Sequence, residues 1–184
     1  MLNQGKKGNV KNVDYTNYEE DVYVGYRYFD SFDVPVSYPF GFGLSYTNFE
    51  YSDAKIAEKD DAYEVTVTVK NTGKYEGKEV VELYTSAPDN KAANKPVKEL
   101  KAYAKTKLLK PGESETLKLT VKAADLASFD EAASAWVVAE GEYQFLVAAS
   151  AQDIKATLTA KAKASQIKAN DVMKPAVKLD LLRR

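Results

Sequence analysis

Carboxylates are the side chains of this chain best suited to do chemistry, and they gather in two acidic clusters. One cluster lies at residues 19–21 and the other at residues 58–61. Two carboxyl groups can cleave a glycosidic bond when one acts as an acid and the other as a nucleophile or base across the sugar. Neighbouring carboxylates in a polar turn do not provide that separation, so residues 58–61 are best explained as a solvated surface. The first cluster stays open, because aromatic side chains follow it directly.

Histidine and cysteine are absent from the 184 residues, which excludes several kinds of chemistry. Without histidine, Ser45 has no general base and cannot be the nucleophile of a Ser-His pair. Without cysteine, the chain can form neither a thiolate nucleophile nor a disulfide bond. The usual zinc ligands are missing as well. Only oxygen ligands, such as those of Asp60 and Asp61 or of Asp89 and Asn90, remain for a cation like Ca²⁺. The sequence therefore predicts no catalytic residue, no cofactor and no metal ligand.

The charges are nearly balanced, with 26 basic and 27 acidic residues and a formal net charge of −1. Such a balance creates no field that would attract nucleic acid or an anionic membrane. No apolar run is long enough for a membrane span, and the first residues lack the apolar region of a signal peptide. We expect neither nucleic acid nor membrane as a partner. The compartment stays open, cytoplasmic or secreted or periplasmic according to a longer parent chain.

A dense run of aromatic side chains occupies residues 23–51. Its centre, VSYPFGFGLSY at residues 36–46, has too much Gly and Pro for a regular element and too many rings for a solvated loop. Such rings can stack on sugars, fill the domain's own core or pack against a neighbouring domain, and packing against protein is favoured. Arg27 within the run is expected to pair with Glu20 or Asp30, or with a carboxylate across an interface.

Alternation of apolar and polar residues predicts strands across residues 52–163. YEVTVTVKNTG is a half-buried strand that ends at a turn, where Gly73 can adopt a positive φ. Similar patterns recur in KEVVELYTS, SETLKLTVK, EYQFLVAAS and DIKATLTAKAK. About seven strands with regular turn signals predict an all-β fold, an antiparallel two-sheet sandwich. We expect five side chains of the later strands to face inward: Trp136, Val138, Tyr143, Phe145 and Val147.

Four segments follow from these patterns. Residues 1–17 are polar and predicted to be a flexible lead. Residues 18–51 form an irregular aromatic linker, and residues 52–163 form the sandwich. Residues 164–184 are a tail or linker with room for a short helix.

Two quoted stretches carry a specific resemblance to a known family. YEEDVYVGYRYFD and YPFGFGLSYTNF resemble the end of the second domain of family 3 glycoside hydrolases, the β-glucosidase and β-xylosidase group. The positions that match the family pattern are Tyr18, Glu20, Gly25, Tyr26, Arg27, Tyr28, Asp30, Pro39, Phe40, Gly41, Gly43, Leu44, Ser45, Tyr46 and Phe49. Asp21 departs from the pattern, since a glycine is commoner there.

The following residues resemble the fibronectin type III-like domain of the same family. The matching pieces are VTVKNTGKYEGKEVVELY, PVKELKAYAKTKLLKPGESETL, LASFD and EGEYQFLVAASAQDIK. Ala148 and Ala151 replace the usual Gly and Ser. The resemblance covers residues 18–160 and implies a fibronectin type III or immunoglobulin-like sandwich, preceded by the linker that leaves an α/β-sandwich domain.

The resemblance also implies where the chemistry lies. In the family the nucleophile is an Asp of a barrel domain, and the acid/base is a Glu upstream of the segment present here. We therefore expect this chain alone to be no enzyme, but a non-catalytic supporting domain of a β-glycosidase that hydrolyses terminal β-glycosidic bonds by a retaining two-carboxylate mechanism. A stand-alone carbohydrate-binding or protein-interaction sandwich is the alternative, and a planar row of exposed Tyr or Trp would favour sugar binding. The sugar, the linkage and the order of the domains in the parent stay open.

The implied partners are the catalytic domains of the parent enzyme. The candidate residues of that interdomain interface are Glu20, Tyr23, Tyr26, Arg27, Tyr28, Tyr38, Phe40, Phe42 and Tyr46. In the isolated chain, exposed Phe40, Phe42 and Tyr46 are expected to form an apolar patch that drives self-association.

Overall fold

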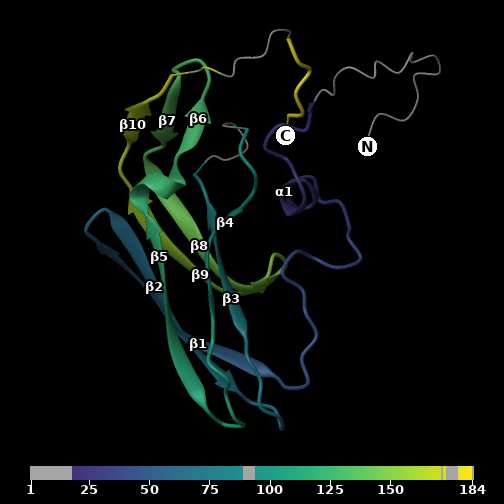
Figure 1. The fold of residues 1–184 in the computed structure, drawn as a ribbon. Helices are drawn as coiled ribbons and strands as arrows, with labels where there is room; N and C mark the ends of the chain where they lie inside the picture. Colours follow the sequence, from purple (N-terminus) through teal and green to yellow (C-terminus); the bar gives the residue numbers. More distant parts are fainter. Residues whose placement is uncertain (1–17, 89–93, 171, 173–177, 184) are drawn as a thin grey trace, which may run out of the picture.

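The computed structural model describes residues 18–88, 94–170, 172 and 178–183, and this part of the chain is nearly all-β (Figure 1). It contains ten strands and one short α-helix, α1 at Tyr26–Ser31. The flexible lead predicted for residues 1–17 lies outside the described residues. None of the described helices is long and apolar enough to cross a membrane. The prediction of an all-β fold is confirmed.

Seven of the strands form the two facing sheets of a sandwich, and all neighbouring strands are antiparallel. The first sheet has the order β1-β2-β5, with β1 at Phe49–Lys59, β2 at Ala62–Asn71 and β5 at Ser114–Lys122. The second has the order β4-β3-β8-β9, with β3 at Val80–Ser86, β4 at Glu99–Lys105, β8 at Gly141–Ser150 and β9 at Asp153–Ala162. Aligned antiparallel sheets of this kind are the architecture of fibronectin type III-like and immunoglobulin-like domains.

A third, small sheet of order β10-β7-β6 lies at one end of the sandwich (Figure 1). The 3-10 helix η1 at Ala123–Leu126 leads into it, and its strands are β6 at Ser128–Asp130, β7 at Ala135–Val138 and β10 at Ser165–Lys168. The sequence predicted a strand that holds Trp136 and Val138, but neither β6 nor β10 nor a separate sheet, because strands this short show no clear period. The described part of the tail therefore holds a strand where the sequence left room for a helix.

The core lies between the two main sheets, and the alternation of β2 shows how it forms. Tyr63, Val65, Val67 and Val69 of β2 are buried, while the residues between them are only half-buried. Each such side chain stabilises the fold by about 1.5–3 kcal/mol when fully buried. Tyr63 meets Phe145 of β8 from the opposite sheet, with ring centroids 5.0 Å apart.

Four of the five side chains expected to face inward are buried: Val138, Tyr143, Phe145 and Val147. Trp136 is not, since its side chain is 49% exposed. It lies on β7 in the small sheet, which extends beyond the end of the core, so period-two alternation does not decide its burial. Its ring contacts Phe129 edge-on, with centroids 5.5 Å apart and planes at 64°.

Asn71 is the last residue of β2. Its side chain connects the turn after β2 to the segment before β1. It is fully buried, and its Nδ2 donates to the carbonyl oxygens of Tyr75 (2.7 Å) and Leu109 (2.8 Å), while its Oδ1 accepts from Thr47 Oγ1 (2.6 Å). The prediction that Gly73 adopts a positive φ is wrong, because its φ is not positive. A Cβ at Gly73 would overlap Thr47 Oγ1, so the glycine permits a close approach of the two segments.

Candidate interdomain interface

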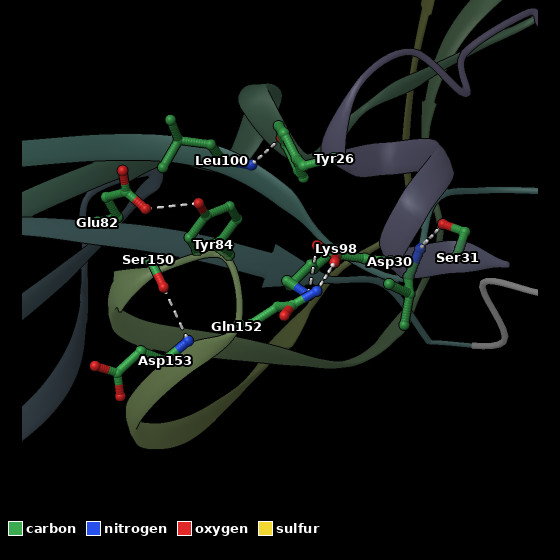
Figure 2. A network of polar contacts seen from close by, with 11 residues as sticks. Tyr26, Asp30, Ser31, Glu82, Tyr84, Lys98, Leu100, Ser150, Gln152 and Asp153 are labelled. Carbon is green, nitrogen blue, oxygen red and sulfur yellow. Dashed lines mark hydrogen bonds and ion pairs between the residues drawn. The ribbon is translucent and has the colours of Figure 1, made fainter. Parts of the chain in front are cut away.

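Residues 18–48, which we call the joint, pack on the outer face of the second sheet, away from the main core. Tyr26 of α1 anchors this packing. Its Oη accepts a hydrogen bond from Leu100 N of β4 (2.8 Å), and its ring lies 5.1 Å from that of Phe40 and 5.7 Å from that of Tyr84 (Figure 2). Tyr84 of β3 is fully buried beneath the joint. A second, smaller apolar core therefore lies outside the sandwich, and its members are Tyr84, Ala148, Ala151, Tyr26, Leu100 and Leu146.

Polar contacts tie α1 to the chain just before β4. Asp30 Oδ2 forms an ion pair with Lys98 Nζ at 2.9 Å, and the two side chains are only 6% and 12% exposed. Gln152 Nε2 donates to Asp30 Oδ1 (3.2 Å), and Val97 N donates to Ser31 Oγ (3.0 Å) (Figure 2). A buried ion pair with further hydrogen bonds holds its geometry firmly, because breaking it leaves an uncompensated charge.

Arg27 has a different partner from the two that the sequence suggested. Its guanidinium lies 3.3 Å from the Glu99 carboxylate on β4, whereas Asp30 pairs with Lys98. The expected pairing with Glu20 or Asp30 is therefore wrong. The pattern of charges could not reveal this, because Glu99 is far from Arg27 in sequence and is placed beside it only by the docking of α1.

A buried carboxylate supports the loop that follows Pro39. Glu82 of β3 is 6% exposed, and its Oε2 accepts a hydrogen bond from Tyr84 Oη (2.6 Å). Burial raises the pKa of the Glu82 carboxyl, and the hydrogen bond from Tyr84 opposes that rise. Gly41 lies directly on this carboxylate with a φ of 82°, and a Cβ there would overlap Glu82 Oε1. Ala151 N donates to the carbonyl oxygen of Phe40 (2.8 Å), so the loop is held by this hydrogen bond as well as by the contact of Gly41 with Glu82.

The structure divides the nine candidate interface residues into three groups, buried, half-buried and exposed. Tyr23 is 1% exposed and donates to Asn94 Oδ1 (3.0 Å), so it is buried within this chain. Tyr26, Arg27 and Tyr28 are half-buried and belong to α1. The exposed candidates are Glu20, Tyr38, Phe40, Phe42 and Tyr46.

The exposed aromatic residues gather on the loop between α1 and β1, and one residue was missed among them. Leu44 is 93% exposed and its neighbour Tyr46 is 95% exposed. The rings of Tyr38 and Phe42 stack obliquely, with centroids 5.1 Å apart. We call Tyr38, Phe40, Phe42, Leu44 and Tyr46 the apolar ridge. Sequence reasoning selected aromatic rings and so passed over Leu44, although its place within the same Gly- and Pro-rich stretch was a usable signal.

Two open crevices lie along α1, and their chemistry is limited. The larger, of about 370 Å³, is lined by Phe29, Asp30, Asp33, Val34, Pro35, Lys98 and Gln152. The smaller, of about 240 Å³, is lined by Tyr26, Phe29, Asp30, Val36, Tyr38, Pro39 and Phe40. The acidic cluster at residues 19–21 lines neither crevice. Among the described residues, no group of His, Cys, Asp or Glu side chains is arranged to hold a metal ion.

The chain is similar to known proteins over most of its length. A family model described as a fibronectin type III-like domain matches residues 79–151. β-Glucosidase A of Butyrivibrio fibrisolvens is 43% identical over 166 residues, which cover 77% of this chain and 20% of the relative. A β-glucosidase of Ruminococcus albus is 44% identical over 153 residues, which cover 80% of this chain and 16% of the relative.

Solved structures agree with these relatives. β-Glucosidase 3B of Thermotoga neapolitana, determined in complex with glucose, superimposes with a TM-score of 0.78 and 47% sequence identity. The match covers 82% of this chain and 21% of that one. A β-glucosidase of Kluyveromyces marxianus in complex with glucose matches with a TM-score of 0.77 and 40% identity, over 83% of this chain and 19% of that one.

The fold and the joint define a class, a fibronectin type III-like sandwich that carries a packed aromatic segment on one outer face. Within that class, the chain belongs to the family 3 glycoside hydrolases and corresponds to the C-terminal part of their β-glucosidases. It spans about a fifth of the length of the relatives it matches. This correspondence is consistent with a non-catalytic supporting domain.

Proposed function

We propose that this chain supports the catalytic domains of a family 3 β-glycosidase and that the apolar ridge is the surface on which those domains dock. The observation that carries the proposal is the contrast within the joint. Tyr23 and Tyr26 pack against other residues of this chain, whereas Tyr46 and Leu44 are almost fully exposed. Several large exposed apolar side chains on one loop of a soluble domain indicate an interaction surface.

The ridge is held in place before any partner arrives. Phe42 N donates to the carbonyl oxygen of Pro39 (3.1 Å), and Ala151 N fixes Phe40 from the β8–β9 turn. Because the backbone is anchored near Phe40 and Phe42, this part of the loop needs little backbone ordering on binding. Glu20 and Arg27, at the polar side of the same segment, suit the rim of such an interface, which is polar and partly solvated.

The parent enzyme in this proposal hydrolyses terminal β-glycosidic bonds with retention, using two carboxylates that lie outside this chain. The β-glucosidase relatives support this assignment. The two acidic clusters offer no substitute for the pair: Asp21 is paired with Arg183 at 3.2 Å, and residues 58–61 are the exposed end of β1 and the turn into β2. A retaining pair needs its carboxyl groups about 5–5.5 Å apart across a bound sugar.

A carbohydrate-binding module is the competing function, and the aromatic geometry does not favour it. Trp136 and Phe129 are adjacent and partly exposed, but their planes meet at 64°. Sugar rings stack on flat faces, so this pair offers no planar platform.

Hydrolysis of an aryl β-glucoside and an aryl β-xyloside tests the proposal. We expect no turnover by the purified chain and turnover by the product of its full parent reading frame. Robust hydrolysis by the chain alone would contradict the supporting role and direct attention back to residues 19–21.

Docking is tested separately by mixing the chain with the catalytic domains of its parent and measuring binding by calorimetry. Phe42→Asp should weaken the complex at least tenfold, because it places a charge at the centre of the ridge. Tyr103→Asp is the control, since Tyr103 is an exposed aromatic residue as well but lies on β4 away from the ridge. Equal binding by both variants would show that the ridge is not the docking surface.

A further inference from the structure

The last described residues of the chain return to the first. The tail leaves the sandwich through β10, which pairs with β7, and Ala169 N donates to the carbonyl oxygen of Ser134 (2.9 Å). Residues 178–183 then lie beside the start of the joint, near α1 (Figure 1). Leu182 N donates to the carbonyl oxygen of Glu19 at 2.8 Å.

A second contact lies next to this hydrogen bond. Arg183 Nη1 is 3.2 Å from Asp21 Oδ2, across a sequence separation of 162 residues. The side chains of Leu179, Leu181 and Leu182 are partly covered, not fully exposed. A backbone bond, an ion pair and covered leucines in one short segment describe a specific contact, since a solvated tail would show none of them.

The segment that receives the tail is itself anchored. Tyr23 lies two residues after Asp21, is buried, and meets Phe32 edge-on with ring centroids 5.0 Å apart. Its backbone N donates to the carbonyl oxygen of Glu20 (2.9 Å). The tail therefore contacts the chain immediately before the point where the joint enters its own core.

From these contacts we infer that residues 178–183 act as a strap that ties the C-terminal tail to residues 19–21 and so restrains the start of the joint. The strap and β10 fasten the tail at two places, one on the small sheet and one on the joint. The inference concerns contacts within this chain and does not depend on the docking proposal.

Disulfide trapping tests the strap cleanly, because the chain has no cysteine of its own. The double variant Glu19→Cys, Leu182→Cys should form an intramolecular disulfide with oxidised glutathione, since the backbone hydrogen bond keeps these two residues close together, as a disulfide requires. The control Glu19→Cys, Lys168→Cys carries its second cysteine on β10, earlier in the same tail. We expect cross-linking at least tenfold faster than in the control, and equal rates would overturn the strap.

Hydrogen exchange measures what the strap does to the joint. Arg183→Asp should accelerate exchange of the Tyr23 amide by up to about fivefold, the range expected for an exposed ion pair. Asp21→Asn, which tolerates the positive φ of 54° at this position, should accelerate exchange to a similar extent, whereas Lys178→Asp, a charge reversal at an exposed position of the strap, should leave the rate unchanged. Unchanged exchange in Arg183→Asp and Asp21→Asn, or an equal acceleration in Lys178→Asp, would overturn the inference.

Discussion

At the scale of single residues, two glycines of the same loop have opposite surroundings. Gly41 has a φ of 82° and lies on the Glu82 carboxylate, whereas Gly43 has an ordinary φ and open space where a Cβ would be. Gly41→Ala should therefore destabilise the protein by about 1–3 kcal/mol, from backbone strain and displacement of Glu82. Gly43→Ala should change stability by less than about 0.5 kcal/mol. Urea unfolding of both variants checks this, and equal midpoints would refute the packing described for Gly41.

The buried Glu82 carboxyl makes stability depend on pH. Burial raises its pKa in the folded protein above the ordinary value of 4.5, so the folded state holds this proton more tightly than the unfolded chain. The stability contributed by neutral Glu82 is full below the unfolded pKa and is lost as pH rises through the folded pKa.

Glu82→Gln isolates this effect, because glutamine stays neutral and its Oε1 can still accept the hydrogen bond of Tyr84. We expect the stability of the wild type relative to this variant to fall as pH rises from 4 to 8, by about 1.4 kcal/mol for each unit of raised pKa. Thermal unfolding across that range measures the difference. A difference that stays constant, or grows with pH, would contradict the raised pKa.

At the scale of elements, α1 depends on its polar contacts with the chain before β4, because six residues are too few for a helix to be stable alone. Asp30→Ala removes the partner of Lys98, whose side chain is only 12% exposed. We expect this change to favour local opening of α1 by about 2–3 kcal/mol, less than the 3–5 kcal/mol typical of a fully buried pair.

Hydrogen exchange of the Phe32 amide, which donates to the carbonyl oxygen of Tyr28 at the end of α1, measures this opening. Asp33→Asn is the control, because Asp33 is exposed and asparagine tolerates its positive φ of 52°. If both variants exchange at the wild-type rate, the ion pair does not hold the helix.

At the scale of the whole molecule, the apolar ridge should make the isolated chain associate with itself. Sedimentation velocity of the purified chain should show a sedimentation coefficient that rises with concentration. The double variant Phe42→Asp, Leu44→Asp should sediment as a monomer at the same concentrations, because charges at exposed positions oppose apolar association. A wild-type chain that stays monomeric with its ridge exposed would contradict the prediction.

Errors in the sequence-based predictions have a common physical origin. Trp136 was assigned to the core and Gly73 to a positive φ, and both rules describe local chain geometry. Their actual environments come from distant segments, the small sheet for Trp136 and Thr47 for Gly73. The predicted ion-pair partners of Arg27 were wrong for the same reason, since its actual partner Glu99 is on another element.

The sequence by itself determined the all-β class, most strands of the two main sheets, though not β1, and the lack of imidazole and thiol chemistry. Alternation and composition are local properties, so no knowledge of distant contacts is needed to find them. Only the tertiary structure decided which aromatic residues of the joint are buried. Tyr26 and Tyr38 lie in one irregular run, and the burial of Tyr26 depends on Leu100, 74 residues away. Packing against a partner so distant in sequence leaves no periodic signal near either residue.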